Sequence, residues 1–85
     1  MRLLVEEVGS GLHPSEAVVI VKTAKGQERL IVSKRSISNG SIEVGWPLRE
    51  DGDDLLIELP RETQAGAWRV WVNRTQITEP ELLRA

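Results

Sequence analysis

The residues best suited to bind another molecule lie in the run AWRVWVN at positions 67–73. Successive side chains of a strand point to opposite faces, so this alternation predicts Arg69 and Trp71 on the face away from the core. An exposed tryptophan beside an arginine is typical of protein-binding hot spots, and tryptophan also stacks on nucleobases. The alternative is that Leu56, Glu58 or a C-terminal helix covers Trp71 and makes it part of a second small core. The predicted binding surface comprises Trp71, Arg69, Arg61 and Asn73.

A second candidate surface is basic. Between positions 22 and 35 the chain carries five basic residues and one acid, Glu28. Such a stripe suits a phosphate backbone, which makes a nucleic-acid-binding β-barrel the alternative function. The net charge of −2 and the absence of Phe and Tyr argue against it. The acidic run 50–58 offers the stripe a partner within one molecule or between two. The stripe comprises Lys22, Lys25, Arg29, Lys34 and Arg35.

Catalytic chemistry is poorly supplied. The chain has no cysteine, and His13 is its only histidine. No serine lies in a G-x-S-x-G arrangement. A Ser–His–acid site would have to use His13, which we interpret instead as a linking residue before Pro14. We therefore expect a protein that is not an enzyme and needs no cofactor.

The acidic residues do not have the spacing of a metal site. Residues 50–54 (EDGDD) lack the alternating ligands and the final glutamate of a calcium-binding loop. We interpret this run as a charged surface turn and expect no metal. Glu58 and Glu62 are predicted to form cross-strand ion pairs rather than an acid–base pair. Their expected partners are Arg61, Arg69 and Arg74.

The composition predicts one small soluble domain spanning residues 1–85. A chain of this length buries a thin core, so self-association would add stability. With three Trp and neither Phe nor Tyr, Val, Ile and Leu must supply nearly all of the core volume. Because cysteine is absent and no apolar run is long enough for a signal peptide or a membrane span, we expect a bacterial-type, cytoplasmic protein without a membrane partner.

The apolar pattern predicts a mainly β fold. Turn residues separate short apolar segments at intervals of roughly a dozen residues, which favours a small antiparallel barrel or sandwich of five to six strands, SH3-like or OB-like. The alternative is an open sheet that dimerises. Thr78 and Glu81 form a capping-box pattern, which predicts a short C-terminal helix at 79–84. The predicted strands are 2–8, 16–23, 28–33, 41–46, 54–59 and 67–73.

Residues 33–40 allow two interpretations. Either Ser33 caps a short helical turn, or Asn39-Gly40 forms a two-residue hairpin turn after a longer strand. No internal repeat is apparent. Trp46 is predicted to share a buried face with Ile42 and Val44. The hairpin 54–73 is expected to supply the central apolar face, composed of Leu55, Ile57, Leu59, Trp68, Val70 and Val72.

These features together favour a non-enzymatic binding module that recognises a protein partner or itself through the Trp71–Arg69 face. A small β-barrel that binds nucleic acid is the alternative function, and an enzyme or enzyme subunit is a third class. The partner and the oligomeric state do not follow from the sequence.

Overall fold

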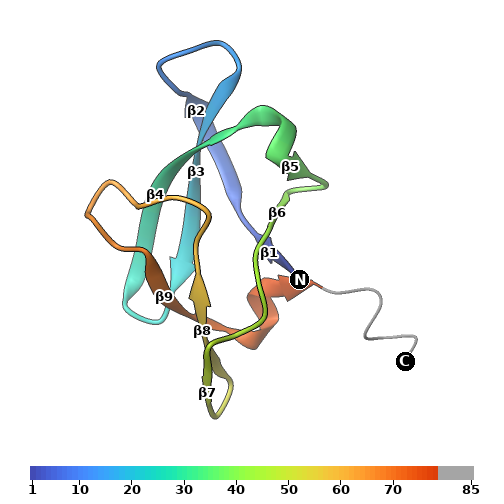
Figure 1. Ribbon diagram of the computed structural model, residues 1–85, viewed down its shortest axis with the longest axis vertical. Coiled ribbons are helices and arrows are strands. Elements are labelled where there is room, and N and C mark those ends of the chain that lie inside the picture. Colours follow the sequence, from blue (N-terminus) through green and yellow to red (C-terminus); the bar gives the residue numbers. More distant parts are fainter. Residues whose placement is uncertain (79–85) are drawn as a thin grey trace.

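The computed structural model describes residues 1–78, and the C-terminal helix predicted at 79–84 lies outside the described residues. Ten short strands and two three-residue 3₁₀ helices form a mainly β protein (Figure 1). All strand pairs are antiparallel, as predicted. The elements are β1 (Arg2–Leu4), β2 (Glu6–Ser10), β3 (Glu16–Thr23), β4 (Gly26–Ser33), η1 (Lys34–Ser36), β5 (Ile37–Ser38), β6 (Ser41–Glu43), β7 (Arg49–Asp51), β8 (Asp54–Glu58), β9 (Arg69–Asn73), η2 (Arg74–Gln76) and β10 (Ile77–Thr78).

The strands are divided among three sheets. Their orders are β10-β1-β6-β5, β2-β3-β4 and β7-β8-β9. Within the described residues these ladders do not join into a closed barrel, so the barrel prediction is wrong for the hydrogen-bonded pattern. The reason is the shortness of the elements: β1, β6 and β7 have three residues each, too few to carry a continuous ladder around a core.

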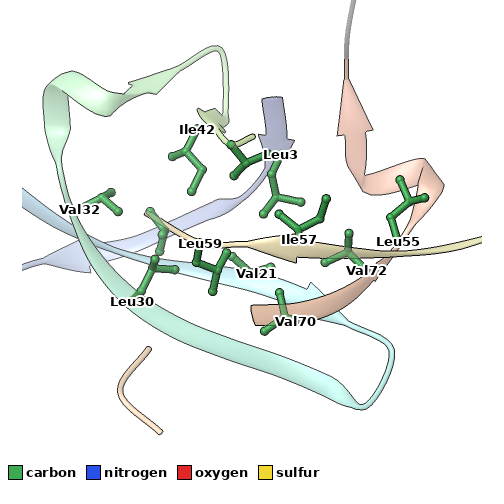
Figure 2. Packing of buried hydrophobic residues seen from close by; sticks show 12 residues of the cluster. Leu3, Val21, Leu30, Val32, Ile42, Leu55, Ile57, Leu59, Val70 and Val72 are labelled. Carbon is green, nitrogen blue, oxygen red and sulfur yellow. The ribbon is translucent and has the colours of Figure 1, made fainter. Parts of the chain in front are cut away.

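The core is aliphatic, as the composition requires. Side chains from all three sheets converge on one cluster (Figure 2), and no tryptophan belongs to its buried members. The segment 16–23, apolar on both faces, is the central strand of its sheet, and its consecutive residues Val19, Ile20 and Val21 are all buried. The cluster consists of Leu3, Val19, Val21, Leu30, Val32, Ile42, Val44, Leu55, Ile57, Leu59, Val70 and Val72.

Two tryptophans predicted to be buried are not. Trp68 is 52% exposed and Trp46 is 65% exposed. Trp68 immediately precedes β9, and Trp46 lies beyond the end of β6, in a segment without strand structure. Side chains alternate between faces only inside a strand. The prediction extended the alternation from Val70 back to Trp68 and from Val44 on to Trp46, and it therefore placed both rings on the wrong face.

The strand boundaries also differ from those predicted. The first predicted strand is divided at Val5 into β1 and β2. The acidic run, expected to be only a turn, contains β7 and a tight connection to β8 at Gly52, whose φ is +63°.

Both interpretations of residues 33–40 prove to be partly right. The Ser33 side chain caps η1 by accepting a hydrogen bond from Arg35 N. Asn39 and Gly40, with φ of 54° and 72°, then form the two-residue turn that joins β5 to β6. Positive φ at both positions is what this class of hairpin turn requires.

The two halves of the described chain have the same order of elements. The first half (residues 1–38) has four strands, then η1 and β5; the second half (residues 40–78) has four strands, then η2 and β10. Residues 32–38 (VSKRSIS) and 72–78 (VNRTQIT) show the correspondence in sequence. The expectation of no internal repeat is therefore wrong. The two segments share the type of residue more often than its identity, and they are only seven residues long, so the similarity is not evident in the sequence.

The hydrogen-bonded pairing relates the two halves by an approximate two-fold axis. Equivalent strands β1 and β6 pair antiparallel, with Leu3 opposite Ile42. Leu3 is also opposite Ile77 of β10, and Ile42 is opposite Ile37 of β5. The β2–β3 connection and the β7–β8 turn accordingly lie at opposite ends of the long axis in Figure 1.

Bonds outside the ladders repeat in the same way. Lys34 N donates to Ser15 O at 2.8 Å, and Arg74 N donates to Asp53 O at 2.7 Å. The pairs of the β8–β9 ladder correspond one to one with consecutive pairs of the β3–β4 ladder. By this register the equivalent positions include Gly11 and Asp51, Glu16 and Asp54, and Ile31 and Trp71. Beyond the matched pairs the same count along the chain relates Thr23, at the end of β3, to Arg61, which follows β8.

Candidate binding site

A hollow of about 380 Å³ lies where the β3–β4 turn meets the β7-β8-β9 sheet. This volume falls within the range of small-ligand and side-chain pockets. Its wall brings together residues from both halves of the chain. The lining residues are Thr23, Ala24, Lys25, Glu28, Asp51, Asp54, Ala67, Arg69, Val70 and Trp71.

Trp71 is held in the wall by contacts of its backbone with β8 on one side and with the β3–β4 turn on the other. In the β8–β9 ladder it lies opposite Leu56, and its carbonyl oxygen accepts a hydrogen bond of 2.8 Å from Ala24 N in the β3–β4 turn. The side chain is partly buried, so neither of the two alternatives for Trp71 holds fully. A partly buried indole that lines a hollow can contact a ligand without first being released from the core.

The charges in the hollow are unbalanced. Arg69 also pairs with Glu58 of β8, with 3.6 Å between Nε and Oε2, as the cross-strand prediction requires. That leaves Lys25 facing the carboxylates of Glu28, Asp51 and Asp54 in the same lining. The excess of carboxylates favours a cationic ligand.

Glu28 has an additional property. Its Oε1 atom is buried and has no hydrogen-bond partner among the described residues. A buried polar atom without a partner costs about 1–3 kcal/mol and is satisfied when a donor arrives. Glu28, one of the lining residues, therefore keeps a hydrogen-bond acceptor that no donor of the described residues uses.

The equivalent place in the first half is occupied by the chain itself. Arg61 extends from the connection after β8 and lies over β4, where its Nη1 donates to Ile31 O at 3.3 Å. The same nitrogen lies 3.8 Å from Oε2 of Glu16. A Cβ at Gly11 would come 2.6 Å from Glu16 Cβ and 3.1 Å from Ile31 Cγ2, so a side chain does not fit at position 11 without a shift of its neighbours.

The predicted binding residues do not form one surface. Trp71 and Arg69 line the hollow. Arg61 is engaged with β4 instead, and Asn73 caps η2 by accepting hydrogen bonds from Thr75 N at 2.9 Å and Thr75 Oγ1 at 2.8 Å.

Four further polar residues of the lining were not predicted, and a signal for one of them was present. Asp51 and Asp54 belong to the acidic run, interpreted only as a turn, although the sequence distance from Asp51 to Trp71 equals that from Gly11 to Ile31 in the repeat. Glu28 and Thr23 join Trp71 only through the packing of the two halves, and no local pattern marks them.

The basic residues are distributed over several places. Lys22 and Arg29 share the outer face of the β3–β4 hairpin, while Lys25 lines the hollow. In the same sheet Glu6 and Arg29 flank Ile20 on either side, so a carboxylate interrupts the row. Lys34 and Arg35 belong to η1, beyond the opposite end of β4.

A second hollow, of about 350 Å³, lies beside Trp46, Leu48 and Pro60. Trp46 and Leu48 are the exposed apolar residues of its wall, at 65% and 47%. Two carboxylates, Glu43 and Glu58, complete its charged lining, but the described residues show no unsatisfied polar atom there. Among the described residues, its lining contains no basic residue and no residue of the first half of the chain.

No family model, curated protein or solved structure matches this chain. Within residues 1–78, no helix has the length and apolar character needed to cross a bilayer.

Proposed function

We propose that this protein is a non-enzymatic binding module that recognises a segment of a partner protein through the hollow at Trp71. The observation that carries the proposal is a partly buried tryptophan in a hollow of about 380 Å³ that also holds three carboxylates. Tryptophan is among the residues that contribute most to protein–protein binding, and surrounding polar groups supply specificity.

The hollow suits recognition better than catalysis. Its titratable residues are carboxylates, Lys25 and Arg69, without a histidine or a hydroxyl nucleophile paired to a base. Thr23 is the only hydroxyl among the lining residues, and it accepts a hydrogen bond from Lys25 N at 3.3 Å. We place this module in the cytoplasm as part of the same proposal, because the absence of cysteine fits a reducing compartment.

The proposal is tested by replacing Trp71 with a smaller apolar residue, which removes the indole but keeps an apolar side chain on this face of the sheet. Trp71→Leu keeps an apolar side chain on β9, and we expect it to remain folded with a loss of about 1 kcal/mol in the free energy of unfolding. Trp46→Leu is the matched control, since Trp46 is exposed and lies outside the hollow. Partner binding, measured by titration calorimetry, should be lost in the first variant and kept in the second.

Analytical ultracentrifugation separates recognition of another protein from recognition of itself. A monomer that unfolds like a core variant when Trp71 is replaced, and that binds no polypeptide through this face, would contradict the proposal. A dimer dissociated by Trp71→Leu would make the chain its own partner.

A further inference from the structure

The approximate two-fold relation offers an internal comparison for the Trp71 hollow. In the first half, the place equivalent to this hollow contains a guanidinium group. Arg61 supplies it, between the carboxylate of Glu16 and the carbonyl oxygen of Ile31. The fold therefore already contains one arginine bound at one of its two equivalent places.

Counted on from the matched ladders, the position that corresponds to Arg61 is Thr23, which lines the hollow. Threonine has no long cationic side chain, so within the described residues no counterpart of Arg61 fills this place. The two residues that contact Arg61 nevertheless have counterparts here. Asp54 corresponds to Glu16, and Trp71 corresponds to Ile31.

The second half also adds groups that favour a cation more strongly. Asp51 replaces Gly11, which adds a carboxylate where the first half has only backbone. The indole of Trp71 replaces an aliphatic side chain, and its face attracts a cation. The buried Oε1 of Glu28 lacks a donor.

Resting on the proposed function, we propose that the Trp71 hollow binds an arginine side chain presented by a separate polypeptide. The guanidinium stacks on the indole of Trp71 and donates to the carboxylates of Asp54 and Glu28. The carbonyl oxygen of Trp71 is not used, because Ala24 N already donates to it.

Arginine fits this place better than lysine. Its planar group stacks on an aromatic face while its five N–H donors point outward in fixed directions. One guanidinium can thus donate to more than one of the carboxylates that line the hollow. An ammonium is more strongly hydrated and offers no flat surface to the indole.

A separate cationic polypeptide fits better than a second copy of this chain. Each copy carries a net charge of −2, so two copies repel each other over long range. A basic segment is instead attracted to the hollow, with a dependence on ionic strength.

The first experiment is a selection from a phage-displayed library of random peptides against the full chain. The Trp71→Leu variant serves for counter-selection, so that only peptides needing the indole are retained. We expect arginine to be enriched at one position of the retained peptides. Retained peptides without enriched arginine would overturn this inference and leave the proposed function standing. A library that yields no Trp71-dependent peptide would count against both.

The second experiment fills the hollow from within. Thr23→Arg places a guanidinium where the first half has Arg61, and Thr23→Gln is the matched control with a long neutral side chain. Both variants lose the hydrogen bond from Lys25 N to the threonine hydroxyl, so that loss cancels in the comparison.

The probes are the blocked tripeptides acetyl-Gly-Arg-Gly-amide, its lysine analogue and its citrulline analogue. Binding is followed by NMR through the indole N–H signals of the three tryptophans, assigned with Trp→Phe variants. We expect the arginine probe to shift the Trp71 signal and leave those of Trp46 and Trp68 in place. The citrulline probe should bind at least tenfold more weakly, because it lacks the charge that strengthens each hydrogen bond.

The variants then decide the assignment. Thr23→Gln measures the effect of a long neutral side chain at this lining position, and Thr23→Arg should weaken binding of the arginine probe at least tenfold more than Thr23→Gln does. Equal binding of the arginine and citrulline probes, equal binding by the two variants, or a Trp71 signal that does not move would each overturn the inference.

Discussion

The two halves of this protein share a backbone arrangement but differ in what fills one pair of equivalent places. In the first half, Arg61 lies against Glu16 and Ile31, and Gly11 packs so closely that a Cβ would collide with Glu16. In the second half, the equivalent positions surround a hollow of about 380 Å³. A shared backbone thus fixes where a pocket can exist, while a few side chains decide whether it is filled by the chain or left for a ligand.

The comparison also separates structural residues from candidate binding residues. Positions that are buried in both halves, such as Val19 and Ile57, serve the core in each. Ser33 and Asn73 cap η1 and η2 in the same way. Trp71 and Asp51 differ in chemistry from their counterparts Ile31 and Gly11, and both line the hollow. Repetition therefore points to residues that the fold needs, and these two departures from it mark the hollow.

The largest effect is expected in the shared core. Ile57 and Val19 are equivalent and fully buried. Ile57→Ala should lower the free energy of unfolding by about 3 kcal/mol, and Val19→Ala by about 2 kcal/mol, because the smaller residue leaves the smaller cavity. Urea unfolding followed by circular dichroism measures both. A loss below 1 kcal/mol at either position would break the equivalence of the two core faces.

A somewhat smaller effect is expected at Gly11. Gly11→Ala brings a Cβ to 2.6 Å from Glu16 Cβ, and relieving that overlap should cost about 1–3 kcal/mol. Gly9→Ala is the matched control, since nothing lies within 4 Å of a Cβ there, and it should change stability by no more than about 0.5 kcal/mol. Thermal unfolding of the two variants side by side checks this. Equal stabilities of the two variants would mean that the contact between Gly11 and Glu16 leaves room for a side chain at position 11.

The caps of the two 3₁₀ helices should contribute about 1 kcal/mol each. Asn73→Ala removes an acceptor for two hydrogen bonds of 2.9 and 2.8 Å, whereas Ser33→Ala removes one of 3.3 Å. We therefore expect the Asn73 variant to lose more stability in urea unfolding, and Asn73→Asp to keep most of it. If Asn73→Ala is as stable as the natural chain but no longer binds, the residue serves binding rather than capping.

The smallest effect is expected at Arg61. Its side chain is 57% exposed and its contacts to Glu16 and Ile31 are long. Arg61→Gln should therefore cost less than about 1 kcal/mol, and the difference should shrink at high salt. A loss that is unchanged by salt would indicate that Arg61 acts through packing rather than charge.

The sequence by itself determined the fold class and much of the core. Without Phe and Tyr, the interior had to be built from Val, Ile and Leu. The alternation of Leu55, Ile57 and Leu59 determined which face of β8 is buried, since a shift by one residue would move all three side chains to the other face of the sheet. The predicted segment 16–23 matches β3 to the residue.

The tertiary structure decided where strands end and what lies beside Trp71. Trp46 and Trp68 sit just outside strands, where local alternation no longer governs which face a side chain takes. Glu28 and Thr23 meet Trp71 only because the two halves pack around a shared axis. Such proximity is a property of long-range pairing, which no local pattern of residues encodes, and the candidate binding site depends on it.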